Sequence, residues 1–457
     1  MKTNHRISLR AATSRRAFLK NSAAALATAA FLPAFPALVP ARVLGRDGAT
    51  APSNRINLGV VGANSQGWSD FRDFFAIKGV EPVAVCDVDR GVLNGRANET
   101  AKRRGVSPET IGRYGDFREM FDKAKLDAVV IGTPDHWHAI IAIAAARKGI
   151  HIYGEKPLAH TLVEGRAIVN AVKQHGVVWQ TGSWQRSRKN FHRAVELVRN
   201  GAIGKITHAE VGTLEIQNGF DWSLASSPDE KTLGKPPAEL DYDMWVGPAQ
   251  FIPYDKRFTR YHWRWVLNFG GGNLMDWVGH HVDIAHWALD FDTTGPLRVE
   301  PDLNYREYST KLPFDAETKY DYKCTYATGQ YVHVASRFPT GVRFYGEKGK
   351  WLRVDRGRLH SSNDAEILNA ANDPNAAPVY RSENHSVNFI ECVRAGRVEG
   401  TITPAETAHR SASVGHLGHI AMQTGRTIHW NPLTETIKGD PAAAALLSPN
   451  YRAPWVL

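Results

Sequence analysis

Residues 56–67 read INLGVVGANSQG, an apolar run that ends in a glycine-containing turn and opens a segment of helical length. Further short apolar runs follow, each separated from the next by enough chain for a helix. They are EPVAVCD at 81–87, LDAVVIGTP at 126–134, GIHIYGEKP at 149–157 and GVVWQTG at 176–182. Runs this uniformly apolar are typical of strands that are covered on both faces. The pattern predicts an α/β domain over residues 54–178, built on a doubly wound parallel sheet.

The pattern changes after residue 178, where strand-like stretches become longer and alternate polar with apolar side chains. Examples are KITHAEVGTLEIQ at 205–217, KYDYKCTYA at 319–327 and QYVHVASRF at 330–338. Such alternation predicts strands with only one covered face. At 457 residues the chain is also long enough for two buried cores. We therefore expect residues 179–457 to form an α+β domain on a mainly antiparallel, open sheet.

The first 41 residues contain six basic and no acidic residues and lead into the apolar run NSAAALATAAFLPAFPAL. Within them, SRRAFLK at 14–20 resembles the twin-arginine consensus, which the export machinery for folded proteins reads as an address. We expect residues 1–41 to be a signal peptide and residues 42–53 a linker. The mature protein would then reside in the periplasm or another extracytoplasmic compartment.

Charge and cysteine content exclude several classes of function. Removing the signal lowers the formal charge from +10 to +4, because six basic and no acidic residues leave with it. The mature part has no basic run interleaved with aromatic residues, so a nucleic-acid partner is not expected. Cys86, Cys324 and Cys392 are widely spaced and odd in number, which predicts isolated core residues rather than disulfides or a cysteine metal site.

The turn at 62–67 is a variant of the G-x-G-x-x-G pattern with asparagine at the middle position. Its positions expected to contact a dinucleotide are Gly62, Asn64, Ser65, Gln66 and Gly67. Asp87 ends the next strand, where its carboxylate could accept hydrogen bonds from ribose hydroxyls and would repel a 2′-phosphate. NAD is thus favoured over NADP, although Arg90 nearby keeps NADP open. Thr133, Pro134 and His138 start a helix at the end of another strand, where parallel sheets bind ligands.

Three further motifs reinforce this interpretation: TPDHWH at 133–138, EKP at 155–157 and GGGNLMDWVGHHVDIAHWAL at 270–289. Together with the glycine turn, they resemble the Gfo/Idh/MocA family of glucose-fructose oxidoreductases and inositol dehydrogenases over about residues 55 to 430. The resemblance implies a Rossmann domain followed by an open-sheet domain, whose exposed face builds a substrate pocket or a homo-oligomer contact. It also implies that Lys156 contacts both the nicotinamide and the substrate, that Glu155 belongs to the cofactor site, and that Asp276 and His280 form an acid–base pair.

Chemistry agrees with these roles. Oxidation of a secondary alcohol needs a base for the hydroxyl proton, and histidine titrates in the useful range. His280 is the candidate base, and Asp276 lies four residues earlier on the same helix face, where it could orient the imidazole. Lys156 could polarise the alcohol oxygen or relay its proton. A metal is not expected, because His280, His281, Asp283 and His286 spread around the helix.

Candidate substrate contacts are less specific. Trp184 and Arg186 follow the last strand of the first domain, and Arg264 lies among the aromatic residues that precede the glycine loop. Aromatic rings beside polar side chains suit sugar recognition, and His281 is added as a neighbour of His280.

The sequence thus predicts an exported NAD(P)-dependent oxidoreductase acting on a sugar, glycoside or polyol. Because free nicotinamide nucleotide is scarce outside the cytoplasm, we expect the cofactor to remain bound and to be regenerated in each cycle. One alternative is NAD-assisted glycoside cleavage or epimerisation through transient oxidation. Another is a sugar-binding protein without turnover, because fold alone does not establish catalysis.

Overall fold

The computed structural model describes residues 54–213, 233–259, 261–310, 312–372 and 378–457. The expected signal peptide and linker, residues 1–53, lie outside these ranges, as does the end of the strand-like stretch at 205–217. Among the described residues, no helix is both long enough and apolar enough to cross a membrane.

The first sheet is parallel, and within the described ranges it has six strands in the order β3-β2-β1-β4-β5-β6. The strands are β1 (Ile56–Val61), β2 (Val80–Cys86), β3 (Gly112–Tyr114), β4 (Ala128–Ile131), β5 (His151–Gly154) and β6 (Trp179–Thr181). The helices between them are α2 (Ser65–Asp73), α3 (Arg90–Arg104), η4 (Pro108–Thr110), α4 (Phe117–Lys123), α5 (Asp135–Arg147) and α6 (Leu162–His175). This strand order is that of doubly wound dinucleotide-binding sheets, in which the ligand binds where the order reverses, here between β1 and β4.

The predicted α/β class is confirmed. The sheet runs through Thr181, slightly beyond the boundary expected at residue 178. Strand β3 was not predicted, because it has only three residues and each is partly exposed, so it carries no apolar run.

The second sheet has nine strands within the described ranges, in the order β15-β14-β13-β7-β12-β11-β8-β16-β17. They are β7 (His208–Gly212), β8 (Arg298–Pro301), β11 (Asp321–Thr325), β12 (Tyr331–Ala335), β13 (Gly341–Tyr345), β14 (Trp351–Val354), β15 (Leu359–Ser361), β16 (Ile428–Asn431) and β17 (Thr436–Ile437). Only β7 and β12 pair in parallel. The prediction of a mainly antiparallel sheet after the parallel one is therefore confirmed.

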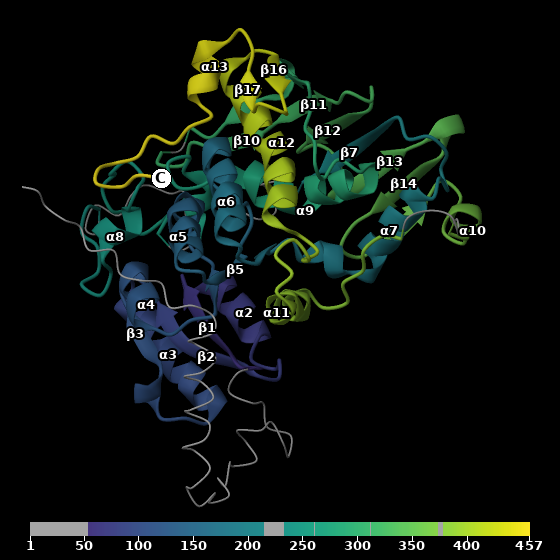
Figure 1. Ribbon diagram of the computed structural model, residues 1–457. Helices are drawn as coiled ribbons and strands as arrows, with labels where there is room; N and C mark the ends of the chain where they lie inside the picture. The colour runs from purple at the N-terminus through teal and green to yellow at the C-terminus, as the bar shows by residue number, and fades with distance from the viewer. Residues whose placement is uncertain (1–53, 214–232, 260, 311, 373–377) are drawn as a thin grey trace, which may run out of the picture. The chain divides into compact units, whose positions relative to one another are not determined.

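Helices cover one face of the second sheet. They include α7 (Lys189–Arg199), α9 (Gly272–Leu289) and α12 (Ala405–Thr424). Shorter elements are η5 (Trp184–Ser187), α8 (Tyr242–Val246), η7 (His262–Trp265), η8 (Leu303–Tyr305), β9 (Glu307–Tyr308), β10 (Glu317–Lys319), η9 (Glu347–Gly349), α10 (Asp364–Ile367), α11 (His385–Ala395) and α13 (Pro441–Ala445). Apolar side chains of α9 and of the central strands form one buried core. Figure 1 shows α9 between α12 and the strands β7 and β13.

The opposite face of this sheet carries half-buried polar and aromatic side chains. His208 stacks between Tyr331 and Tyr345, with ring centroids 4.6 and 4.4 Å apart. These residues alternate with buried ones on the same strands, such as Ala209 and Val211, which pack into the core. The expected homo-oligomer contact through this open face stays a prediction.

The last part of the chain packs back on the first domain. Phe389 of α11 contacts Phe74 and Tyr153, with ring centroids 6.0 Å apart in both pairs. Helix α12 packs on α6 of the parallel-sheet domain and also on α9. Helix α12 therefore contacts both domains at once, and through it the position of α9 relative to the first domain is fixed.

The three cysteines behave as predicted from their spacing. Cys86, Cys324 and Cys392 are all free and buried.

Candidate active site

The glycine turn after β1 is set by close backbone packing. Gly62 has φ +79°, and a Cβ there would lie 2.8 Å from the backbone of Gly132. A Cβ on Gly67 would lie 2.1 Å from the carbonyl oxygen of Gly62. Asn64 has ordinary extended angles, φ −107° and ψ 160°, and its side chain accepts a hydrogen bond from the Ser65 amide as the N-cap of α2. The middle position therefore needs a capping side chain rather than a residue that tolerates unusual angles.

We expect Gly67→Ala to lower the free energy of unfolding by at least about 3 kcal/mol, because its Cβ meets a backbone oxygen that cannot move independently. Thermal unfolding and NAD titration of the variant would measure the effect, with affinity falling alongside stability. Gly95→Ala is the matched control, because Gly95 lies in α3 and a Cβ added there would meet nothing within 4 Å. That variant should be neutral or more stable by about 0.5–1 kcal/mol. Equal stability and equal NAD affinity of the two variants would refute the claim that Gly67 is required by close backbone packing.

Asp87 ties the end of β2 to the glycine turn. Its carboxylate accepts hydrogen bonds from the amides of Ala63, at 2.9 Å, and Asp89, at 3.0 Å. Burial raises the pKa of Asp87 to about 6, although these amides oppose the rise. Asp89, which the sequence reasoning did not single out, caps α3 and also lines the pocket. Arg90, whose charge had left NADP binding possible, donates a hydrogen bond to the Ala238 carbonyl at 2.6 Å. Its guanidinium therefore already has a partner within the protein.

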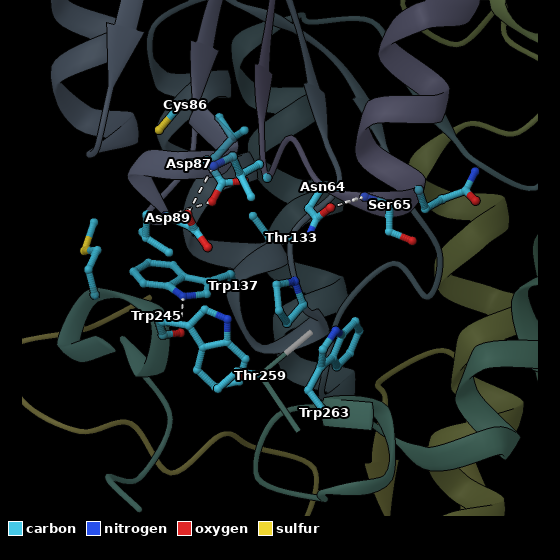
Figure 2. Close-up of a pocket in the computed structure, with 18 of the residues that line it drawn as sticks. Asn64, Ser65, Cys86, Asp87, Asp89, Thr133, Trp137, Trp245, Thr259 and Trp263 are labelled. Carbon is cyan, nitrogen blue, oxygen red and sulfur yellow. Dashed lines mark hydrogen bonds between the residues drawn. The ribbon is translucent and has the colours of Figure 1, made fainter. Parts of the chain in front are cut away.

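A cavity of about 340 Å³ opens where the strand order reverses. Figure 2 shows Asn64, Asp87 and Thr133 on one side of it and Trp245, Thr259 and Trp263 on the other. The predicted residues that line it are Gly62, Asn64, Ser65, Gln66, Asp87, Thr133, Pro134, Glu155, Lys156, Arg264 and Asp276. Residues that were not predicted include Asp89, Asp135, Trp137, Met244, Trp245 and Trp263.

The cavity fits a dinucleotide. It runs from the N-terminus of α2, where backbone N–H groups favour a pyrophosphate, to Lys156 beyond β5. The hydroxyl oxygen of Thr133 is buried in its wall and has no hydrogen-bond partner among the described residues. A buried hydroxyl without a partner is costly, so a ligand group is the natural partner here.

Lys156 and Asp276 form an ion pair in the cavity wall. The Lys156 ammonium donates to Asp276 Oδ1 at 2.6 Å and to its backbone carbonyl at 3.1 Å. Arg264 Nε also reaches Asp276 Oδ1, at 3.4 Å, and its guanidinium stacks on Trp263. Although burial opposes both changes, the pair lowers the pKa of Asp276 and raises that of Lys156. Lys156 is therefore a fixed cation and hydrogen-bond donor.

This geometry corrects one expectation. Asp276 was expected to orient His280, yet its carboxylate is directed to Lys156 and Arg264, and the described residues show no Asp276–His280 hydrogen bond. Helix α9 can approach Lys156 because Gly279 lacks a side chain: a Cβ there would lie 2.8 Å from Lys156 Cβ.

His280 is 5% exposed and lies beside Trp184 and Trp277, with ring centroids 6.0 and 5.7 Å away. Burial, reinforced by the charges of Lys156 and Arg356, holds the pKa of His280 well below its usual range. The imidazole is thus neutral and has a lone pair that can accept a proton, although its lowered pKa makes it a weaker base. It is not among the residues that line the cavity.

Asp135 is a site residue that the sequence reasoning missed. It is 5% exposed, begins α5 and lines the cavity. Burial raises its pKa to about 7, opposed by the charges of Arg264 and Lys156. The signal was present in TPDHWH, where an acidic residue at a helix start is usually taken for a cap.

Three predicted ligand contacts have other partners. His138 is buried, and its ring nitrogens lie 2.8 Å from the Pro157 carbonyl and 2.9 Å from the Thr133 carbonyl, so it positions these two loops. Gly67 packs against the backbone of Gly62 and Gly132 instead of lining the cavity. His281 is fully buried and contacts the Gly212 carbonyl at 2.7 Å.

Arg186 is also a core residue rather than a substrate contact. Its guanidinium is 2% exposed and bonds both oxygens of Asp283, at 2.7 and 2.9 Å, and both oxygens of Asp292, at 2.8 and 2.7 Å. It also stacks on Trp287, 5.1 Å from the ring centroid. All three guanidinium nitrogens therefore have acidic partners within the fold.

The side chains considered as metal ligands also point to separate partners. Asp283 binds Arg186, and His286 contacts the Tyr326 hydroxyl at 2.6 Å. No group of three histidine, cysteine or acidic side chains in the described part of the chain is placed to hold a metal ion.

Comparisons with known proteins agree with this geometry. Residues 56–183 match the profile "Oxidoreductase family, NAD-binding Rossmann fold", and residues 189–457 match "Oxidoreductase family, C-terminal alpha/beta domain". A glycosyl hydrolase family 109 protein of Shewanella baltica is 29% identical over 211 residues, which cover 43% of this chain and 45% of that protein. An alpha-N-acetylgalactosaminidase of Shewanella oneidensis is 29% identical over 160 residues, 34% of each chain. The alignments therefore span less than half the length of these curated relatives.

Among solved structures, the WlbA dehydrogenase of Bordetella pertussis, in complex with NADH and UDP-GlcNAcA, superposes with a TM-score of 0.59. It is 18% identical, and the match covers 82% of this chain and 98% of that one. At this identity the likeness shows the fold. The two profiles together span both domains, and the cavity lies where an NAD-binding Rossmann domain places its cofactor. The chain belongs to the Gfo/Idh/MocA oxidoreductase family and carries that family's NAD-binding domain.

Proposed function

We propose that this chain is an exported NAD-dependent oxidoreductase that oxidises a secondary alcohol of a sugar, glycoside or polyol. The observation that carries the proposal is the Lys156–Asp276 pair, with its 2.6 Å contact, in the wall of a cavity that begins at the glycine turn. A fixed ammonium at the far end of a dinucleotide site is suited to binding the oxygen at which the reaction occurs.

The role of each residue follows from its charge state. Held by the glycine turn and Asp87, bound NAD would supply the hydride acceptor for the carbon that bears the alcohol. Lys156 donates a hydrogen bond to the alcohol oxygen and stabilises the negative charge that develops there. Neutral His280 accepts the hydroxyl proton. Asp276 keeps Lys156 protonated and in place, so it acts as a positioning residue.

Turnover would separate this enzyme from a sugar-binding protein. The NAD-loaded protein is mixed with a panel of sugars, methyl glycosides and inositols while nicotinamide absorbance is followed. We expect at least one neutral or charged member to reduce the nicotinamide. Binding of a sugar, measured by calorimetry, without reduction by any member would favour the non-catalytic alternative.

Export motivates the second part of the proposal. The SRRAFLK motif supports transport of a folded protein, and such a protein must acquire its nucleotide before it leaves the cytoplasm. We expect denaturation of the purified mature protein to release close to one NAD per chain. If the protein is empty and turns over only with added NAD, cofactor retention is refuted while oxidoreduction stands.

NAD-assisted glycoside cleavage is a second candidate, favoured by the names of the curated relatives and by Asp135. In that reaction the hydride returns to the same sugar, so the net change is addition of water across the glycosidic bond. With a pKa of about 7, Asp135 is partly protonated at neutral pH and could protonate the departing oxygen.

The same residue provides the test. Asp135→Asn should abolish release of methanol from methyl glycosides yet spare nitrophenyl glycosides, whose leaving group needs no proton. Cleavage of methyl glycosides by the unmodified protein should fall as pH rises through about 7, because the acid form is lost. Absence of methanol release at any pH would leave plain oxidation as the activity.

A further inference from the structure

Two arginines and two tryptophans form a cluster beside His280 that the cavity does not include. We propose that Arg188 and Arg356 bind an anionic group, carboxylate or sulfate, on the sugar substrate. This inference rests on the proposed function, since it concerns the substrate of the same site. We call Arg188, Arg356, Trp184 and Trp277 the arginine cluster.

Three elements bring the arginine cluster together. Arg188 follows η5, Arg356 lies in the turn between β14 and β15, and Trp277 lies on α9. The guanidinium carbons of Arg188 and Arg356 lie 4.8 and 4.9 Å from the ring centroid of Trp184. Arg356 also lies 4.6 Å from the ring centroid of Trp277. Both cations therefore contact the ring of Trp184, which restrains side chains that are otherwise flexible.

Neither arginine has an anionic partner in the part of the chain that the structure describes. Within the described ranges, neither makes a hydrogen bond or an ion pair through its guanidinium. The carboxylate next to Arg356 in the chain, Asp355, pairs with Arg353 at 3.3 Å instead. Both arginines are exposed to solvent. Partial desolvation and the neighbouring charge of Arg188 lower the pKa of Arg356, with the charge of Asp276 opposing. Two cations on one aromatic ring, neither with an ion-pair partner among the described residues, form a site that an anion would stabilise.

The cluster lies next to the proposed base. Trp184 and Trp277 both contact the ring of His280, and the charge of Arg356 acts on that imidazole. An anion bound by the two guanidiniums would thus lie beside rings that contact the proton acceptor. That placement suits a substituent on the same sugar as the alcohol that reacts. Trp184 itself offers an aromatic face of the kind that packs against sugar C–H groups.

Binding can be tested without turnover. D-Glucuronate, glucose 6-sulfate and glucose are titrated by calorimetry into the NAD-loaded protein at low salt. We expect at least one of the two anionic sugars to bind about tenfold or more tightly than glucose, as charge-assisted hydrogen bonds require. Raising the salt concentration should reduce the difference in affinity between the anionic sugar and glucose. Preference for glucuronate alone would identify a carboxylate, and preference for the sulfate alone would identify a sulfate ester.

Variants assign the preference to the arginine cluster. Arg188→Gln and Arg356→Gln should each remove most of the preference and leave the affinity for glucose and the Tm unchanged, since neither residue pairs within the described part of the fold. Arg358→Gln is the matched control, because it removes a nearby exposed charge from the same turn. Equal affinities for glucose and both anionic sugars overturn the inference, as does an equal loss of preference in Arg358→Gln. If glucuronate binds as expected but no sugar is oxidised, the proposed function fails and the anion site stands.

Discussion

Replacing Lys156 with alanine is expected to lower kcat by roughly a thousandfold or more, which is the scale seen when a preorganised charge at the reacting oxygen is lost. The ammonium is fixed by Asp276 at 2.6 Å, so no other described cation can take its position without moving. Arg264 is the nearest candidate, yet its Nε lies 3.4 Å from the same carboxylate and its guanidinium stacks on Trp263. Steady-state rates with the best substrate of the panel would measure the effect.

The affinity of the Lys156→Ala protein for NAD should change only a few-fold, because the glycine turn and Asp87 bind the other end of the cofactor. Lys123→Ala is a suitable control, since it removes an exposed lysine paired only with Glu119 on α4. A Lys156→Ala protein that is folded and keeps more than a tenth of its kcat would remove Lys156 from the mechanism.

Arg186→Met should lower the free energy of unfolding by about 3–5 kcal/mol, the usual cost of breaking a buried ion pair. The substitution leaves the buried carboxyl of Asp283 and the partly exposed carboxyl of Asp292 without their shared cation. Burial already raises the pKa of Asp283 to about 6, and removing Arg186 would raise it further. Because a carboxyl with a raised pKa favours folding less as pH increases, the variant's deficit should be larger at pH 8 than at pH 5.

Thermal unfolding at the two pH values would measure this deficit. The double variant Arg186→Met/Asp283→Leu should recover part of the stability, because it removes one of the two unpaired carboxyls. An Arg186→Met protein with unchanged Tm but a raised KM for the sugar would restore Arg186 as a substrate contact.

The parallel sheet was predictable because its strands are buried on both faces, and this burial leaves runs such as AVVI at 128–131 without a polar residue. The glycine turn was predictable for a related reason, since strand ends in such a sheet converge on one edge. The role of Lys156 was predicted instead from the resemblance of the EKP motif to the family. Strand β3 and the exact role of Asn64 were not predictable, because a short edge strand and a helix cap leave only local signals.

The sequence did not predict which side chains pair with one another at the site. Arg186 and Asp283 are 97 residues apart, and an arginine beside tryptophans reads equally well as a sugar contact or as half of a buried ion pair. Asp276 shares a helix face with His280, yet the stronger partner is Lys156, 120 residues away. Periodicity places residues on faces, but competition between distant charges decides which of them pair.

The packing of α11 and α12 on the first domain has a consequence for how the protein is made. The core around β1 includes Phe389 and Ile390, which the ribosome adds long after the parallel strands. Until they emerge, Phe74 and Tyr153 lack the aromatic ring of Phe389 that packs on both of them. The nucleotide-binding half therefore lacks part of its core until residues 389 and 390 have been made, and a chain stopped after residue 183 would expose the apolar side chains that they cover. Completion of the core behind the cofactor site is thus a late step of synthesis.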